Sequence, residues 1–318
     1  MDAPAAVSST PPGVGASVPG VGRATALVAF SACCFGSIAT FVTVATRAGA
    51  RLPEVLAWRF LVAAMLLAIV AGGPSSVRRE ARREARRGLR LAVLAGGGQA
   101  AIGGLSLSAL RYIPAATMIF LFYTYPAWVT VISAVRGKEA LTGRRVIALV
   151  LSLAGIAVMV GLPSAETASL ATPGVLLALA GALLYALYIP MIDHLGRGLA
   201  PALTATYATA GAGVILAVVA ALTGGFVVRQ PATVWLMILA LAVLCTVIAF
   251  ICFLHGLAAI GPVRTAIVST VEPFWGAFLA SIVLAQPLAA RTLMGGGLVA
   301  AAVIILNLPQ RVDTHVVA

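Results

Sequence analysis

Ten apolar runs of about 20 residues follow one another along this chain, separated by short breaks of glycine, proline and charged residues. A helix of that length spans the hydrocarbon core of a bilayer. The chain is 61% hydrophobic and 9% charged, which lies outside the range of water-soluble domains. The sequence therefore predicts an all-α membrane protein with about ten transmembrane helices. The predicted spans are 24–46, 54–72, 90–109, 114–135, 145–162, 173–194, 200–223, 233–256, 262–284 and 292–308.

Lysine and arginine residues are distributed unevenly between alternate loops. Fifteen fall on one side of the membrane and five on the other, and seven of the fifteen lie in the stretch from Arg78 to Arg90. Cytoplasmic loops carry the excess of basic residues, so both termini are predicted to be cytoplasmic in a multi-pass protein of the cell membrane. The net charge of +12 is thus attributed to topology and to contact with the lipid bilayer, and no nucleic-acid partner is expected.

The two ends of the chain differ from the apolar runs. Residues 1–22 are rich in Pro, Gly, Ser and Ala, and predict a disordered cytoplasmic tail rather than a signal peptide. Residues 309–318 are predicted to form a short cytoplasmic C-terminal tail. The four cysteines lie inside apolar runs and are interpreted as packing residues, so neither a metal nor a cofactor is expected.

Two short stretches reveal an internal repeat. When "YTYPAWVTV" is set above "TVEPFWGAF", Pro126 aligns with Pro273 and Trp128 with Trp275, a shift of 147 residues. The shift divides the chain into a first repeat at 23–162 and a second at 173–308, each with five helices. Because five is odd, the two copies enter the membrane from opposite sides and form an inverted pair. Inverted pairs of this kind support alternating access in transporters.

The repeat also resembles a known family. The stretch "LSLSALRYIPAATMIFLFYTYPAWVTVISAVRGKEALTGRRVIALVLSLAGIAVMVG" is similar to the end of an EamA domain, and "EVLAWRFLVAAMLL" to its second helix. The second half repeats the pattern more loosely in "EPFWGAFLASIVLAQPLAARTLMGGGLVAAAVII", where Gln286 replaces the acid that matches Glu139. The resemblance implies a ten-helix carrier of the drug/metabolite transporter superfamily, whose members export amino acids and other metabolites.

Glu272 is the candidate site residue with the strongest physical argument. An acidic side chain near the centre of a span costs roughly 2.5–3.5 kcal/mol on insertion. At ten residues into its run, Glu272 is expected about 15 Å deep. A desolvated carboxyl there favours its neutral form and can exchange a proton with a cavity, which suits a proton-coupled carrier. The alternative is a neutral or ion-paired group that braces a helix break at Pro273.

Two prolines and a set of aromatic residues extend the candidate site. Pro126 and Pro273 each remove a backbone donor, which predicts a helix break at a central cavity or, alternatively, a kink that only improves packing. Aromatic residues recur near them at helical spacing, and are predicted either to bind an apolar or cationic substrate or to pack in the core. These residues are Phe122, Tyr125, Trp128, Tyr185, Tyr188, Trp275 and Phe278.

Two further polar residues lie within the predicted spans. Arg59 is only a few residues from the outer end of its span, which predicts snorkelling to that interface, with a substrate carboxylate or an internal acid as the alternative partner. Gln99 lies among small residues in "AGGGQAAIGG" and is interpreted as a cavity donor or as a polar contact between helices.

Taken together, these patterns predict a secondary active transporter that exports a small metabolite, amino acid-like or another small organic compound, by alternating access, with protons as the suggested coupling ion. No phosphate-binding loop, HExxH motif or Ser-His-Asp set is found, so an ATP-driven mechanism and an enzyme are not expected. The alternatives are an intramembrane enzyme acting on a lipid-like substrate and a channel. The sequence contains no pattern that sets an oligomeric state.

Overall fold

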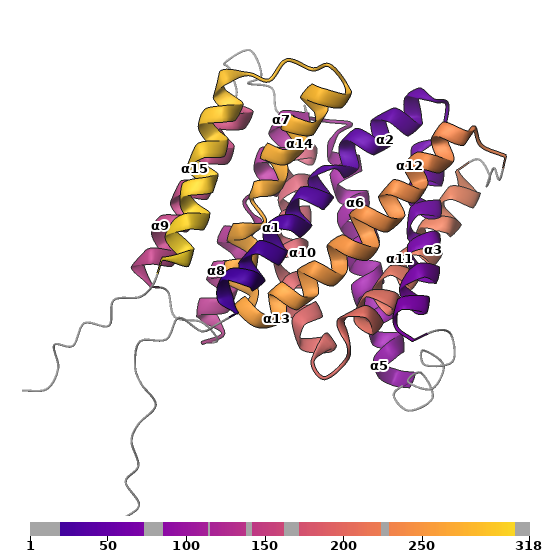
Figure 1. Ribbon diagram of the computed structural model, residues 1–318, viewed down its shortest axis with the longest axis horizontal. Helices are drawn as coiled ribbons and strands as arrows, with labels where there is room; N and C mark the ends of the chain where they lie inside the picture. Colours follow the sequence, from indigo (N-terminus) through magenta and orange to yellow (C-terminus); the bar gives the residue numbers. More distant parts are fainter. Residues whose placement is uncertain are drawn as a thin grey trace, which may run out of the picture.

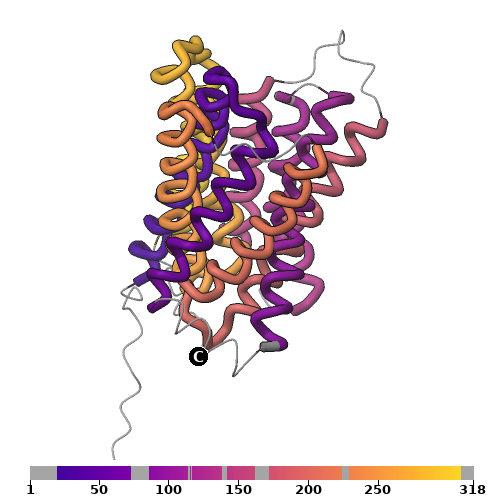
Figure 2. Tube along the Cα trace, turned by 90° about the vertical axis from the view of Figure 1, so that its right-hand side faces the viewer, coloured from indigo at the N-terminus to yellow at the C-terminus, as the bar shows by residue number. Residues whose placement is uncertain are grey.

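The computed structural model describes residues 20–72, 85–113, 115–137, 142–161, 172–223 and 229–308. Within these ranges every regular element is a helix, and the helices run side by side as one bundle (Figure 1). Gly20 and Leu308, the first and last described residues, lie at the same end of the bundle, which we call the terminal face (Figures 1 and 2). The two tails predicted from the sequence, apart from residues 20–22, and Glu139 fall outside the described residues.

The helices of the first half form five crossings. The first crossing bends at Ser37, and the third contains a π-helical segment. The helices are α1 (Val21–Gly36), α2 (Ile38–Arg47), α3 (Leu52–Val70), α5 (Ala85–Arg90), η1 (Leu91–Gly96), α6 (Gly97–Ala109), α7 (Ala115–Phe122), α8 (Tyr125–Val135) and α9 (Gly143–Val160).

The second half repeats this plan, again with a π-helical segment in its third crossing. The helices are α10 (Thr172–Gly196), α11 (Pro201–Leu222), α12 (Ala232–Ala242), η3 (Val243–Ile248), α13 (Ala249–Val268), α14 (Val271–Val283) and α15 (Ala290–Asn307). Gly261, inside α13, has φ 78° and ψ 169°, so the chain turns sharply there. The residues after Gly261 therefore belong to the ninth crossing, which continues into α14.

Nine helical stretches among the described residues are long and apolar enough to span a membrane, and α14 is a shorter apolar helix. The prediction of an all-α membrane protein is confirmed. The count of ten is approximate, because the stretch Ala232–Val268 counts once although it runs through the turn at Gly261, and α14 is too short to count by itself. The boundaries of the ninth crossing follow from Gly261 and Pro262, which end one helix and start the next.

The contacts between the halves follow a two-fold pattern. The second helices of the two halves, α3 and α11, pack together, and so do the fifth helices, α9 and α15. The first helix of each half packs against the third crossing of the other half: α1 against α13, and α10 against α6. This reciprocal pairing is what a pseudo-two-fold axis between two repeats produces.

Small residues allow the fifth helices to approach closely. A Cβ built on Gly155 in α9 would lie 2.6 Å from the carbonyl oxygen of Gly295 in α15. No real Cβ atom tolerates that distance, so this pair of backbones can meet only where both residues are glycine. Such small-residue contacts are typical of helix packing in membranes.

Candidate functional site

The fourth and ninth crossings are both interrupted near their middle. The fourth breaks at Tyr123 and Thr124, between α7 and α8, and the ninth at Ser269 and Thr270, between α13 and α14. In each break the threonine hydroxyl donates a 2.6 Å hydrogen bond to the carbonyl oxygen three residues earlier. Both threonines thus partner a carbonyl beside the break, where unpaired backbone groups are costly in a membrane.

The two prolines lie just after these breaks. Pro126 is the second residue of α8 and Pro273 the third residue of α14. The first four N–H groups of a helix have no partner within it, so a proline at either position loses no hydrogen bond. The threonines are 146 residues apart and the prolines 147, so the proline follows its threonine one residue later in the second repeat than in the first.

Glu272 lies in the first turn of α14, directly after the break, and its side chain is half-buried. The side chain of Tyr123, from the break in the other repeat, lies within hydrogen-bonding range of its carboxyl group. Tyr125 and Tyr185 also lie within electrostatic range of this carboxyl. Glu272 therefore lies where the break of one repeat meets the break of the other.

Arg59, in α3, is a cation within electrostatic range of Glu272. Its Nε donates a 2.8 Å hydrogen bond to Oγ1 of Thr246, and its Nη2 a 2.9 Å bond to the carbonyl oxygen of Cys245, both in η3. Only 6% of Arg59 is exposed. The structure therefore differs from the predicted snorkelling, because η3 supplies hydrogen-bond acceptors inside the bundle.

The predicted aromatic residues separate into two groups. Tyr125 lies 4.6 Å from Tyr185 between ring centroids, and Phe122 stacks on Tyr185 at 5.6 Å. Tyr188 continues the group at 6.1 Å from Tyr185, and Tyr123 joins it at 5.8 Å from Tyr125. We call these five rings the aromatic cluster, and three of them, Tyr123, Tyr125 and Tyr185, lie within electrostatic range of Glu272.

The two tryptophans lie apart from the aromatic cluster. Trp128 is 40% exposed on the outside of α8. Trp275 makes a ring contact with Phe278 at 5.7 Å, and its Nε1 donates a 3.0 Å hydrogen bond to Oγ of Ser37, where α1 meets α2. Helical spacing grouped them with the tyrosines, but within α8 Tyr125 is buried whereas Trp128, three residues later, is exposed.

Two buried polar atoms near this region have no hydrogen-bond partner within the described residues. They are Oε1 of Gln99, in α6, and the hydroxyl of Tyr188, in α10. A Cβ built on Gly98 would meet the ring of Tyr188 at 3.1 Å, so the two helices are in close contact here. Unpaired buried polar groups cost about 1–3 kcal/mol each, and ordered water or a ligand would satisfy them.

Two cavities of about 540 Å³ each lie toward opposite ends of the bundle. The first opens toward the terminal face, between α8, α10 and the sharp turn at Gly261. The second lies between α3, α6 and α11, toward the opposite face, and both Arg59 and Gln99 line it. The cavities differ in chemistry, because charged side chains line the first and mainly apolar ones the second.

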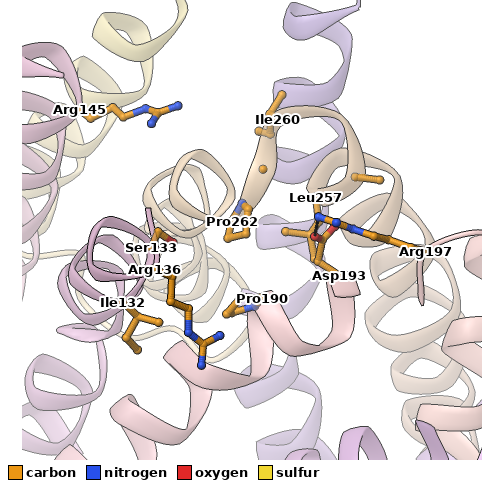
Figure 3. Close-up of a pocket in the computed structure, with 12 residues that line it drawn as sticks. Ile132, Ser133, Arg136, Arg145, Pro190, Asp193, Arg197, Leu257, Ile260 and Pro262 are labelled. Carbon is orange, nitrogen blue, oxygen red and sulfur yellow. Dashed lines mark hydrogen bonds and ion pairs between the residues drawn. The ribbon is translucent and has the colours of Figure 1, made fainter. Parts of the chain in front are cut away.

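Figure 3 shows the cavity at the terminal face. Three arginines, Arg136, Arg145 and Arg197, come from three different helix ends around it. Asp193 pairs with Arg197 at 2.9 Å, which the dashed line marks. The lining therefore carries more positive than negative charge.

Comparison with known proteins identifies the chain. A sequence profile described as the EamA-like transporter family matches residues 23–161 and again residues 172–308. The chain belongs to the EamA-like transporter family. The double match confirms the duplication inferred from the repeat, and makes this EamA-like protein a member of a family of membrane transporters.

A solved crystal structure has the same fold as this EamA-like protein. It superposes with a TM-score of 0.71 at 20% identity, over 90% of this chain and 96% of the other. At that identity the likeness supports the fold alone. No curated protein matches the chain.

Sequence reasoning did not single out three groups that contact the pair of charged residues. Tyr123 falls off the helical spacing that selected Tyr125, and is brought to Glu272 by the helix break. Thr246 and the backbone of Cys245 reach Arg59 from a π-helical segment. A buried arginine requires acceptors, but apolar sequence around 245 gives no sign of which helix supplies them.

Proposed function

We propose that this EamA-like transporter exports a small metabolite by alternating access, and that Glu272 couples transport to protons. The observation that carries the proposal is the position of Glu272 at a helix break, half-buried and within electrostatic range of Arg59 and Tyr123. An ionisable group at membrane depth is by default a functional group with a specific partner. Export is proposed because EamA-domain carriers, which the sequence resembles, export metabolites.

The two cavities support alternating access. They lie toward opposite faces of the bundle, as two access routes to one central site would. The reciprocal packing of the repeats gives two similar halves that can exchange conformations. In this proposal the substrate meets Arg59, Gln99 and the tyrosines of the aromatic cluster at the centre.

The basic residues support a cytoplasmic terminal face. The described ends of α8, α10 and α5 at this face carry Arg136, Arg197 and Arg90. Excess of Lys and Arg marks the cytoplasmic side, so the proposed location is the cell membrane with both termini inside.

Transport can be tested in two steps. Extracellular metabolites are first compared between cells with and without the protein to find the substrate. Purified protein in liposomes should then move that substrate chemically unaltered, exchange it against unlabelled substrate on the other side, and change its flux when a pH gradient is imposed. Chemical conversion would identify an enzyme, and flux without such exchange would identify a channel.

A further inference from the structure

We infer that this transporter has a binding site for an anionic phospholipid, between α5 at the start of the third crossing and the end of α10. A headgroup with two phosphates matches the charge of this site, and acyl chains match the apolar surface beside it. The inference goes beyond the proposed function, because it depends neither on the substrate nor on the coupling ion.

A basic pocket lies at the terminal face, where α5 meets the end of α10 (Figure 1). Its volume is about 490 Å³, and it shares no lining residue with the two cavities described above. The lining residues are Arg86, Arg87, Arg90, His194 and Leu195. No acidic side chain from the described part of the chain lines this pocket. Basic pockets between transmembrane helices on the cytoplasmic side are typical binding sites for the headgroups of anionic lipids.

Contacts on two sides hold α5 in place. The Nε of Arg87 donates a 3.1 Å hydrogen bond to the carbonyl oxygen of Leu195, and its Nη2 donates one to the carbonyl oxygen of Arg197. A Cβ built on Gly88 would lie 3.0 Å from the ring of Tyr207, so α5 also packs closely against α11. The fold therefore positions the walls of the pocket through protein contacts alone.

Two other arginines of α5 provide the charge that a ligand would meet. Arg86 and Arg90 are one helical turn apart, and both are exposed. Their guanidinium groups and the ring of His194 make no hydrogen bond or ion pair with any other described residue. A guanidinium group binds two oxygens of a phosphate with parallel hydrogen bonds, and a histidine ring adds a further donor. Two such guanidinium groups match a headgroup with two phosphates.

The sequence around α5 has an excess of positive charge. The stretch from Arg78 to Arg90 contains seven arginines and two glutamates, Glu80 and Glu84, which leaves five net positive charges. Of these nine residues, the structure describes the three arginines that line the pocket. Clusters of four to eight basic residues next to a transmembrane helix are typical of anionic-lipid binding.

The depth of the pocket favours a lipid over a soluble phosphate compound. The candidate span Arg86–Ala109 has 24 residues, whereas about 20 cross the hydrocarbon core, so its first turn extends into the layer of lipid headgroups. Leu89, in the same turn as the arginines, is 64% exposed, and Val93, in the next turn, is 58% exposed. A lipid with its phosphates at the arginines can pack its acyl chains on this apolar surface.

The test measures lipid binding to purified, delipidated protein by native mass spectrometry. Tetraoleoyl cardiolipin has two phosphates, dioleoyl phosphatidylglycerol has one phosphate and one net negative charge, and dioleoyl phosphatidylcholine is zwitterionic. The first cardiolipin should bind at least tenfold more tightly than phosphatidylcholine, and phosphatidylglycerol should lie between them. Equal affinity for the three lipids would overturn the inference.

Two double variants separate the pocket from the general charge of the protein. Arg86→Gln with Arg90→Gln should lose at least tenfold in affinity for the first cardiolipin. The matched control is Arg47→Gln with Arg111→Gln, which removes two exposed arginines from the ends of α2 and α6 at the opposite face, and should bind like the wild type. Equal losses in the two double variants would overturn the assignment of the lipid to this pocket.

A charge-preserving variant checks the geometry of binding. Thermal unfolding without added lipid first establishes that each variant is folded. Arg86→Lys with Arg90→Lys keeps both charges but loses the paired hydrogen bonds of each guanidinium group, and should weaken cardiolipin binding several-fold. Unchanged affinity in this variant would contradict the proposed contact between arginine and phosphate.

Competition distinguishes a lipid from a soluble phosphate compound. Inorganic phosphate and the deacylated headgroup of cardiolipin carry the same phosphate chemistry without acyl chains. A hundredfold excess of either compound should displace less than half of the bound cardiolipin, because neither packs on the apolar surface of the helix. Displacement of more than half would assign the pocket to a soluble phosphate compound and overturn the lipid.

Discussion

The broken helices of the fourth and ninth crossings are alike in backbone and different in charge. Both bend near their middle, both tie a carbonyl to a threonine hydroxyl at 2.6 Å, and both restart with a proline in the first turn. Only the ninth crossing carries an acid, Glu272, whereas the fourth contributes Tyr123 and Tyr125 to its surroundings. The duplicated sequence therefore accounts for the bend, and the divergence of the copies accounts for the chemistry.

Arg59→Gln should have the largest effect on stability, because it removes the positive charge near Glu272. Removing the guanidinium leaves Glu272 without its counter-charge, and costs about 3–5 kcal/mol in the free energy of unfolding if Glu272 stays ionised. Equilibrium unfolding in mixed micelles measures this cost. The double variant with Glu272→Gln should recover much of it, because both charges are then absent.

The control for Arg59 is Arg197→Gln. Arg197 pairs with Asp193 at 2.9 Å at the terminal face, and its side chain is 65% exposed. Exposed pairs contribute about 0–1 kcal/mol, so the loss should be small. Equal losses at Arg197 and Arg59 would contradict the special position of Arg59 inside the bundle.

Gly36→Ala should have an intermediate effect on stability, because it changes the packing of α1 against the start of α14. A Cβ on Gly36 would lie 2.5 Å from the carbonyl oxygen of Glu272 and 3.2 Å from the backbone nitrogen of Gly276, so the start of α14 would have to shift. Overpacking of this kind costs about 1–3 kcal/mol. Gly181→Ala tests the equivalent approach of α10 to the first break, where the nearest atoms are at 3.7 Å, and should be tolerated. Thermal unfolding of both variants measures the two losses of stability. A larger loss for Gly181→Ala than for Gly36→Ala would contradict the expected order.

Thr124→Val and Thr270→Val should have the smallest effects and the most similar ones. Each removes one hydroxyl hydrogen bond to a carbonyl beside a break, at a net cost of about 0.5–1.5 kcal/mol. The losses in the free energy of unfolding of the two variants, measured under the same conditions, should agree within a few tenths of a kcal/mol. A clear difference between them would mean that the two bends are not held in the same way.

Much of the fold follows from the sequence in physical terms. Apolar runs of bilayer length require helices, and an odd-numbered repeat requires inversion, so the architecture needs no knowledge of side-chain contacts. The sharp turn at Gly261 is visible as a Gly-Pro pair, yet the two-part ninth crossing that follows it depends on where Thr270 caps α14.

The site was less predictable than the fold. Glu272 and the tyrosines could be selected because charge and aromatic spacing are local properties of the sequence. Arg59 could not be placed, because its burial depends on acceptors from η3, 186 and 187 residues away along the chain. Trp128 was grouped with Tyr125 by helical spacing within α8, but its exposure on the outside of the bundle follows from tertiary structure alone.

The central claim is that the charge of Glu272, and not the bend that the two repeats share, couples transport to protons. The most direct measurement compares exchange of substrate with flux under an imposed pH gradient, in liposomes that contain wild type, Glu272→Gln or Glu54→Gln. Glu54 is a buried acid held by Arg51 away from the centre, so its variant should behave like the wild type. Glu272→Gln should keep exchange and lose the response to the gradient, and an undiminished response in Glu272→Gln would contradict the account.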